Sequence, residues 1–136
     1  MNCVVCKAFD AGISPFGSQK IVETNNIIGI LVTNEAASRG HCIFLPKTHT
    51  EKMHQVEDQV LSEIIQTIKR VAKAMNLDNY NVLQNNGDLA FQTLFHVHFH
   101  LIPKNSEEDG LRYLRDKNEL REFDQTGVAE MIMTNL

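Results

Sequence analysis

The sequence predicts an α+β domain in which a five-stranded antiparallel sheet packs against one long helix. Five short runs of β-branched and aliphatic residues are separated by polar segments, and strands joined by short turns pair antiparallel. One longer segment has apolar residues at every third or fourth position, which is the period of a helix with one buried face. A chain of 136 residues fits a single domain, residues 1–136, with a sizeable core.

The first three strands are expected in the N-terminal third of the chain. Residues 19–23 and 27–33 are rich in β-branched and aliphatic side chains and flank two asparagines, which is the pattern of a tight hairpin. After a small, polar connection, residues 41–45 predict a buried central strand. Pro46 ends that strand because proline has no backbone N–H to donate to a neighbouring strand.

The remainder of the chain supplies the helix and two more strands. Residues 57–75 predict the long helix, and residues 80–83 predict the fourth strand. A loop that contains glycine is expected over residues 85–92, and the fifth strand over residues 94–102. About residues 105–136 form a polar tail with a helix-prone composition. The apolar stripe of the helix consists of Val60, Leu61, Ile64, Ile65, Ile68, Val71, Ala72 and Met75.

Half of the six histidines occupy alternate positions in the fifth predicted strand. Side chains alternate between the two faces of a strand, so three imidazoles share one face and three apolar side chains share the other. We expect the apolar side chains to pack against the helix and the imidazoles to face a polar cleft, because a one-residue slip in register would exchange the two faces. The histidines are His96, His98 and His100, and the apolar residues are Val97, Phe99 and Leu101.

This alternation indicates chemistry at phosphorus. Three imidazoles spaced about 7 Å apart repel one another when all are protonated, so at least one is expected to be neutral at physiological pH. A neutral imidazole is a good nucleophile and proton carrier, and a protonated neighbour can hold an anionic oxygen. A polar strand face without a function is the simpler alternative, but three histidines set against clean hydrophobic residues favour a functional site.

Composition and charge exclude some classes of partner. The formal net charge is −4 and there is no long basic run, so we expect no large nucleic acid as a partner. No segment approaches the roughly 20 apolar residues that span a bilayer, so we expect no membrane partner. The chain has three cysteines, and an odd number fits a reducing compartment better than a disulfide framework. These features predict a cytoplasmic protein.

The segment from His96 to Ile102 resembles the hallmark of the histidine triad (HIT) superfamily, in which three histidines alternate with apolar residues and two apolar residues follow. Residues 85–93 resemble the family's asparagine and glycine loop, and residues 41–49 resemble its segment with a histidine at each end. The resemblance implies a HIT-like fold and nucleotidyl transfer or hydrolysis at the α-phosphate of a nucleoside phosphoramidate or a dinucleoside polyphosphate. It also implies a purine nucleotide as substrate and a homodimer, with the tail from Asp109 onward completing the partner's pocket.

The resemblance further implies roles for four histidines and three loop residues. His98 would attack the α-phosphorus, and water would then hydrolyse the nucleotidyl-histidine. The backbone carbonyl of His96 would fix the tautomer of the His98 ring. Residues in contact with phosphate oxygens would be His100 and His41, although a core position is the alternative for His41.

The loop residues would act on both sides of the phosphate. Asn85 would anchor the phosphate side, with simple turn chemistry as its alternative. Gln92 and Thr93 would assist the leaving group through backbone or hydroxyl donors. Phe91 stands where many relatives carry a small residue, so its ring would either narrow the leaving-group side or point away from it.

The second strand departs from the family pattern at its end. Relatives that bind nucleosides usually place an aspartate there for the ribose hydroxyls, whereas this chain has Thr33 and Asn34. We therefore expect a different ribose contact.

Two cysteines near the N-terminus predict part of a metal site. Cys3 and Cys6 are separated by two residues, so both thiolates can reach one ion. Resemblance to the zinc-containing, bacterial-type HIT hydrolases implies that His49 and His96 complete the site. One structural zinc per chain and no catalytic cofactor are therefore expected.

Two other classes of function remain open at the level of the sequence. In one, the three alternating histidines hold a catalytic zinc and its water, as histidines do in zinc hydrolases. In the other, the chain is a nucleotide-binding module without catalytic activity. Metal content after replacement of His98 distinguishes the first alternative, and turnover distinguishes the second.

Overall fold

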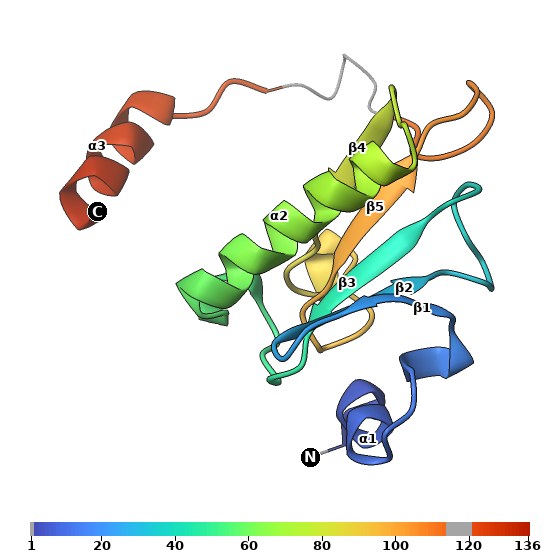
Figure 1. The fold of residues 1–136 in the computed structure, drawn as a ribbon. Helices are drawn as coiled ribbons and strands as arrows, with labels where there is room; N and C mark the ends of the chain where they lie inside the picture. Colours follow the sequence, from blue (N-terminus) through green and yellow to red (C-terminus); the bar gives the residue numbers. More distant parts are fainter. Residues whose placement is uncertain (1, 114–120) are drawn as a thin grey trace.

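The chain forms one five-stranded antiparallel sheet with a long helix across one face, as the computed structural model shows for residues 2–113 and 121–136 (Figure 1). The strand order in the sheet is β1-β2-β3-β5-β4, and every neighbouring pair is antiparallel. This arrangement confirms the predicted α+β class. The strands are β1 (Lys20–Glu23), β2 (Ile27–Leu31), β3 (Cys42–Pro46), β4 (Tyr80–Leu83) and β5 (Phe99–Pro103).

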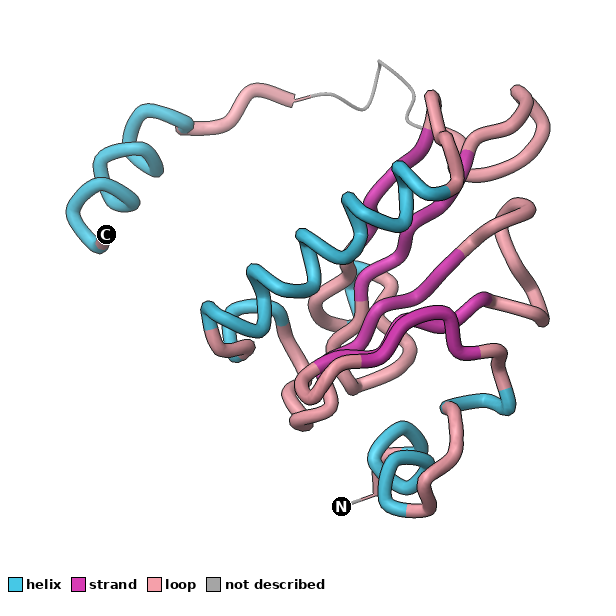
Figure 2. Tube along the Cα trace, viewed as in Figure 1, coloured by secondary structure: helices cyan, strands magenta, loops and turns pink. Residues whose placement is uncertain are grey.

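In the described part of the chain, three α-helices accompany the sheet. The long helix α2 (Asp58–Ala74) matches the predicted range to within a residue at each end and lies across the sheet (Figure 2). The short helix α1 (Val4–Asp10) lies on the other side of the sheet from α2. Helix α3 (Gln125–Asn135) lies away from the sheet and has no buried residue. The predicted tail thus includes a helix, while residues 114–120 of that prediction fall outside the described part of the chain.

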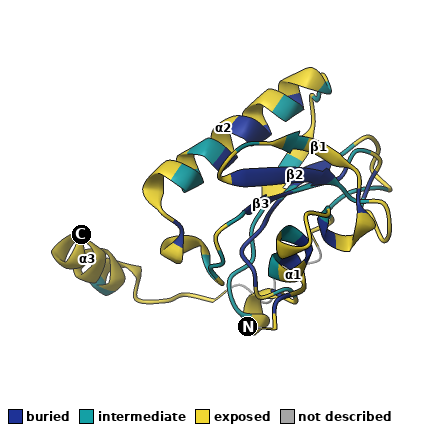
Figure 3. Ribbon diagram, turned by 60° about the horizontal axis from the view of Figure 1, so that its bottom comes forward, coloured by how far each residue is buried: buried dark blue, intermediate teal, exposed yellow. Residues whose placement is uncertain are grey.

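The face of the sheet toward α2 contains the larger core, and the expected packing of the last strand on the helix is confirmed. Val97, Phe99 and Leu101 are between 0% and 2% exposed and belong to one cluster with Ile64 and Ile68 of α2. A second cluster on the opposite face joins residues of β2 and β3 to the N-terminal segment, as the dark blue strands next to α1 show in Figure 3. Its buried members are Cys3, Val5, Ile28, Ile30 and Leu45.

The prediction of the fifth strand as residues 94–102 was wrong at its start. Strand β5 begins at Phe99, so only His100 of the three alternating histidines lies within a strand. The pairing of β5 with β3 extends from the Phe44–Phe99 pair to the Cys42–Leu101 pair. N-terminal to β5, the N–H of Val97 donates to the carbonyl of Thr50 at 2.8 Å. Thr50 lies in the loop after β3, so this part of the chain pairs with a loop and not with β3. The three imidazoles therefore do not line one strand face evenly.

The second strand is also shorter than predicted, because β2 ends at Leu31 and not at residue 33. Cys42 lies in the core, with 1% exposure, and burial raises the pKa of its thiol to about 11. None of the helices in the described part of the chain combines the length and apolar content needed to cross a bilayer.

Candidate functional site

The ring of His98 is held by one backbone carbonyl. Its Nδ1 lies 2.9 Å from the carbonyl oxygen of His96, the partner implied by the family resemblance. A carbonyl oxygen only accepts hydrogen bonds, so Nδ1 carries the proton and Nε2 keeps its lone pair. Nε2 has no hydrogen-bond partner among the described residues, so the tautomer is that of a nucleophile.

The His98 ring is more enclosed than a ring in an open cleft, with only 7% of the residue exposed. Its Nε2 nevertheless keeps contact with the surface. In the described part of the chain, only three side-chain nitrogen or oxygen atoms lack both solvent contact and a hydrogen-bond partner, and they are Ser14 Oγ, Ser38 Oγ and Thr50 Oγ1. Nε2 of His98 has no partner and is not among them, so it is in contact with solvent. Burial is the main cause that lowers the pKa of His98, and the bond to the carbonyl of His96 opposes it. The ring is therefore neutral at physiological pH.

The imidazoles of His41 and His100 form a hydrogen-bonded pair beside His98. Nε2 of His41 lies 2.9 Å from Nδ1 of His100, and the backbone N–H of Ala37 donates to Nδ1 of His41 at 3.0 Å. A backbone N–H only donates, so Nδ1 of His41 is unprotonated and its Nε2–H donates to His100. His100 then carries its own proton on Nε2. Burial above all, and the nearby His98 and His41, lower the pKa of His100 to about 4, so this arrangement of neutral rings persists at physiological pH.

The two neighbouring rings thus present opposite groups. The centroids of His98 and His100 are 4.9 Å apart, with the ring planes at 73°. One ring offers a lone pair on Nε2 and the other offers an N–H on Nε2. A nucleophile beside a hydrogen-bond donor suits attack on a phosphorus centre, because the donor stabilises negative charge on a phosphate oxygen as the new bond forms.

The ring of His41 contacts His100, and the direct phosphate contact that the resemblance implies stays a prediction. Both of its ring nitrogens are engaged, one by Ala37 and the other by His100, and the residue is 7% exposed. In this geometry the ring of His41 holds the proton of His100 on Nε2. Backbone groups such as the Ala37 N–H carry no signal in the sequence that could have indicated this role.

The loop after β4 is organised by the side chain of Gln92, which is 3% exposed. Its Oε1 accepts from the N–H of Gly87 at 2.7 Å, and its Nε2 donates to the carbonyls of Glu51 and Leu94 at 2.7 and 3.1 Å. The side-chain amide of Gln92 is therefore fully used in hydrogen bonds that hold the loop. Any contact of Gln92 with a leaving group would come from its backbone, while the neighbouring Thr93 is exposed.

Two further loop residues complete this picture. The side-chain amide of Asn85 lies 3.5 Å from the carbonyl oxygen of Phe91, which is a long hydrogen bond. Phe91 has a left-handed backbone with φ of 64° and is 84% exposed, so its ring points away from the protein. A phenylalanine in this backbone region is strained, since a side chain there crowds the following carbonyl.

A small cavity lies beside the histidines. Ile43 is the register partner of His100 in β5 and of Ile30 in β2, so these residues share the sheet face opposite α2. A cavity of about 150 Å³ is lined by Ile30, Ile43 and the end of β2, including Thr33 and Asn34. Its other lining residues are Phe16, Ser18 and Val32.

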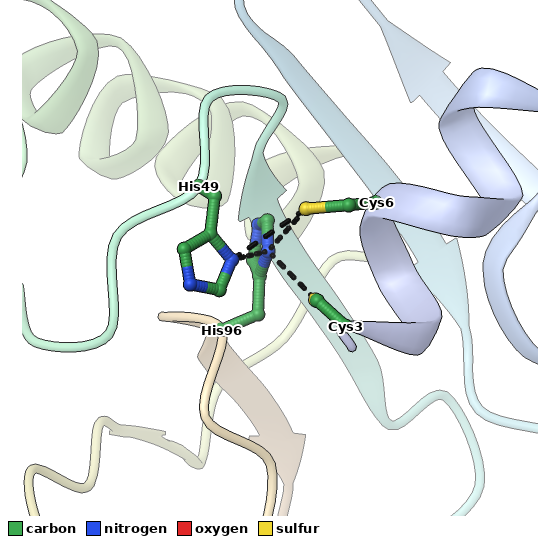
Figure 4. Close-up of side chains that lie close together, drawn as sticks. All are labelled: Cys3, Cys6, His49 and His96. Carbon is green, nitrogen blue, oxygen red and sulfur yellow. Dashed lines mark hydrogen bonds between the residues drawn. The ribbon is translucent and has the colours of Figure 1, made fainter. Parts of the chain in front are cut away.

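Four side chains from three parts of the chain form a candidate metal site, and they are Cys3, Cys6, His49 and His96 (Figure 4). One ligand atom from each lies within 4.8 Å of all the others. Nδ1 of His96 lies 3.5 and 3.7 Å from the two sulfurs and 3.2 Å from Nδ1 of His49. Tetrahedral zinc, with bonds of about 2.0 Å to nitrogen and about 2.3 Å to sulfur, separates two nitrogens by about 3.3 Å and nitrogen from sulfur by about 3.5 Å. These distances fit a tetrahedral ion.

The remaining nitrogen of the buried ligand also fits a metal site. Nε2 of His96 lies 2.8 Å from the carbonyl oxygen of Pro46, so Nε2 is protonated and Nδ1 is left free to bind. Among residues 2–113 and 121–136, the group of side chains close enough to share an ion does not include His98 or His100. This geometry disfavours a catalytic zinc on the three alternating histidines.

Lys47 and His54 do not belong to the two groups of side chains described above. Lys47 pairs with Glu23 at 2.9 Å. His54 is exposed.

Comparisons with known proteins agree with this geometry. The HIT domain family model matches residues 17–107. The chain is 45% identical over 109 residues to adenosine 5'-monophosphoramidase HNT1 of Saccharomyces cerevisiae, a match that covers 80% of this chain and 66% of that protein. It is 42% identical over 111 residues to adenosine 5'-monophosphoramidase hnt1 of Schizosaccharomyces pombe, a match that covers 82% of this chain and 80% of that protein. This chain thus spans about two thirds of the length of the budding-yeast relative.

Solved structures show the same fold. The histidine triad nucleotide-binding protein from Candida albicans superposes with a TM-score of 0.81 at 34% identity, covering 98% of this chain and 96% of that chain. A Zn-bound histidine triad family protein from Mycobacterium smegmatis superposes with a TM-score of 0.68 at 33% identity, covering 88% and 87%.

Proposed function

This chain belongs to the HIT domain family, and we propose that it is an enzyme that hydrolyses nucleoside phosphoramidates, or dinucleoside polyphosphates, at the α-phosphorus. The observation that carries the proposal is the pair of neighbouring rings with opposite groups. Nε2 of His98 has a free lone pair, and Nε2 of the adjacent His100 has a proton to donate. The monophosphoramidase activity named for the two yeast relatives supports the same reaction class.

The reaction proceeds in two steps. The lone pair of His98 Nε2 forms a bond to phosphorus while the bond to the leaving amine breaks, and its electron pair leaves with a substrate nitrogen that already carries the proton. The Nε2–H of His100 donates to a phosphate oxygen without being transferred. Water then attacks the phosphorus of the nucleotidyl-histidine, and the P–Nε2 bond breaks with its electron pair returning to Nε2. One proton of the water stays on the product phosphate and the other goes to solvent.

The cavity beside His100 receives the nucleoside of a purine nucleotide. Phe16, Ile30 and Ile43 offer apolar surface for a base, and the hydroxyl and amide of Thr33 and Asn34 offer neutral polar groups near the ribose. Asn85 and Thr93 stand on the loop that faces the phosphate and the leaving group.

The cluster of Cys3, Cys6, His49 and His96 holds one zinc ion per chain. Its interatomic distances support this assignment, as does the zinc-bound relative from Mycobacterium smegmatis. All four positions are filled by protein, so the ion supplies structural stability and leaves the phosphorus chemistry to His98 without a catalytic cofactor.

The enzyme is a cytoplasmic homodimer in this proposal. Strand β4 lies at the edge of the sheet and exposes 44% of Tyr80 and 47% of Val82. Met131 and Met133 of α3 are also exposed, at 55% and 70%. An edge strand and an apolar helix without partners in the described chain support a second copy as partner, with the tail from Asp109 onward reaching its pocket.

A covalent adduct tests the proposed function. The protein is incubated with an adenosine phosphoramidate and quenched early, and the peptide that contains His98 is examined by mass spectrometry. A nucleotidyl adduct is expected in the unmodified protein and in His54→Ala, but not in His98→Ala. Tight nucleotide binding without turnover or adduct would instead indicate a binding module. Loss of the metal in His98→Ala would indicate a catalytic zinc site.

A further inference from the structure

The peptide group between His96 and Val97 connects the candidate metal cluster to the ring of His98. Its carbonyl oxygen accepts the hydrogen bond from Nδ1 of His98 at 2.9 Å, and its N–H donates to the carbonyl of Thr50 at 2.8 Å. The carbonyl belongs to one metal ligand, His96. Thr50 directly follows another, His49. The peptide group is therefore part of one ligand, His96, and is hydrogen-bonded to the neighbour of another, His49.

We propose that the metal cluster is a positioning device for the nucleophile, in which ligation of His49 and His96 holds the peptide group that orients the ring of His98. This inference rests on the proposed function, because it takes His98 as the nucleophile. It assigns the cluster a role in catalysis in addition to the stability of the N-terminal segment.

The first connection runs through the side chain of His96. The residue is 0% exposed, its Nε2–H donates to the carbonyl of Pro46, and its Nδ1 points to the other three ligand atoms (Figure 4). With both ring nitrogens held, the ring is fixed relative to the end of β3. The carbonyl of the same residue, which receives the proton of His98 Nδ1, is then fixed as well.

The second connection runs through His49. The hydrogen bonds of its ring within the described chain are those to Cys6 at 3.5 Å and to His96 at 3.2 Å, and both lie inside the cluster. When no ion draws these atoms together, the ring has little else to hold it. The carbonyl of Thr50 would then be free to shift, and with it the N–H of Val97.

Loss of this peptide plane affects the tautomer of His98. Without the carbonyl in place, the proton can move to Nε2, and that ring has no lone pair directed at a substrate. Groups that orient a ligand or a catalytic ring from outside the reacting atoms typically change activity by about 10- to 100-fold. We therefore expect a decrease of that size in kcat, with KM nearly unchanged, because the nucleoside cavity does not depend on the peptide plane.

The test compares the full-length protein with zinc and after chelation. Side-chain ¹⁵N NMR reads the tautomer of His98, and steady-state kinetics with an adenosine phosphoramidate give kcat and KM. Chelation is expected to replace the single Nδ1-protonated state by a mixture and to lower kcat about 10- to 100-fold. His49→Ala should show the same change in the presence of zinc, and the matched control His54→Ala should not.

A chelated protein that keeps its circular dichroism spectrum, its single His98 tautomer and its kcat would overturn the proposal. If chelation unfolds the chain, the comparison is made between the Zn²⁺ and Cd²⁺ proteins, because the larger ion lengthens the bonds to both histidine ligands. Equal kcat and equal tautomer signals with the two ions would then overturn it.

The same samples separate this inference from the proposed function. The rate of adduct formation on His98 is measured in each metal state. An adduct that forms equally fast in all states refutes the positioning role alone. Turnover without an adduct in any state refutes the proposed function.

Discussion

Replacement of His41 by asparagine tests how the Nε2–H of His100 is held in place. The shorter asparagine side chain can still accept from the N–H of Ala37, but it cannot reach Nδ1 of His100. His100 then has no donor to its Nδ1, so its proton is no longer confined to Nε2. Loss of one preorganised donor to a developing oxyanion costs about 10²- to 10³-fold in kcat, or about 2.7 to 4 kcal/mol.

We therefore expect kcat of His41→Asn to decrease at least about 100-fold while KM changes by less than about threefold. His41→Gln should recover part of the loss, because its longer amide can donate to His100. Steady-state kinetics with an adenosine phosphoramidate measure both constants, and His54→Ala serves as the control. An increase of KM at constant kcat would refute this reasoning, since it would show that His41 binds the phosphate directly.

Three further predictions concern the loop, the pH dependence and the metal. Gln92→Ala leaves a partly buried N–H and two carbonyls without their side-chain partner, so we expect a loss of about 1 to 3 kcal/mol in the free energy of unfolding, measured in urea. The exposed Gln66→Ala should lose less than about 0.5 kcal/mol. The pKa of His100 is about 4 in the folded protein, below its ordinary value of 6.5. The unfolded chain therefore binds more protons between these values, so stability should fall on acidification from pH 6.5 to pH 4, by at most about 1.4 kcal/mol per pH unit, and His100→Gln should reduce the slope. Elemental analysis should find one zinc per chain that is lost in Cys6→Ser and retained in His98→Ala; the opposite result would contradict the assignment of the ligands.

The presence of the strands and of the long helix could be predicted because both depend on periodic patterns. The stripe from Val60 to Met75 gave α2 to within a residue at each end, and the alternation around Phe99 gave the buried face of β5. The start of β5 could not be predicted in this way. The alternation of apolar residues and histidines continues back to Phe95. However, His96 lies in the candidate metal cluster and the N–H of Val97 donates to Thr50, so tertiary contacts delay the start of the strand to Phe99.

In the candidate site, the side chains could be predicted from the sequence but their hydrogen-bond partners could not. The motif indicated which side chains gather, because His98, His100 and the four metal ligands are recognisable by type and spacing. The partners that set their protonation are mostly backbone groups, such as the N–H of Ala37 and the carbonyl of Pro46. Every residue but proline has both groups, so residue types alone contain no signal for them.

Backbone partners have a consequence that side-chain partners would not have. His98 faces a carbonyl, and the His41–His100 pair ends at an N–H, and neither group changes its protonation in the range where an enzyme works. A carboxylate in place of the carbonyl would also hold the proton on Nδ1 of His98, but it would add a negative charge that raises the pKa of the ring and favours its protonation. The neutral carbonyl sets the tautomer without that charge, and burial keeps the pKa low. The lone pair on Nε2 is therefore available across the physiological range, and the activity should decline only on acidification below about pH 6.5, the ordinary pKa of histidine.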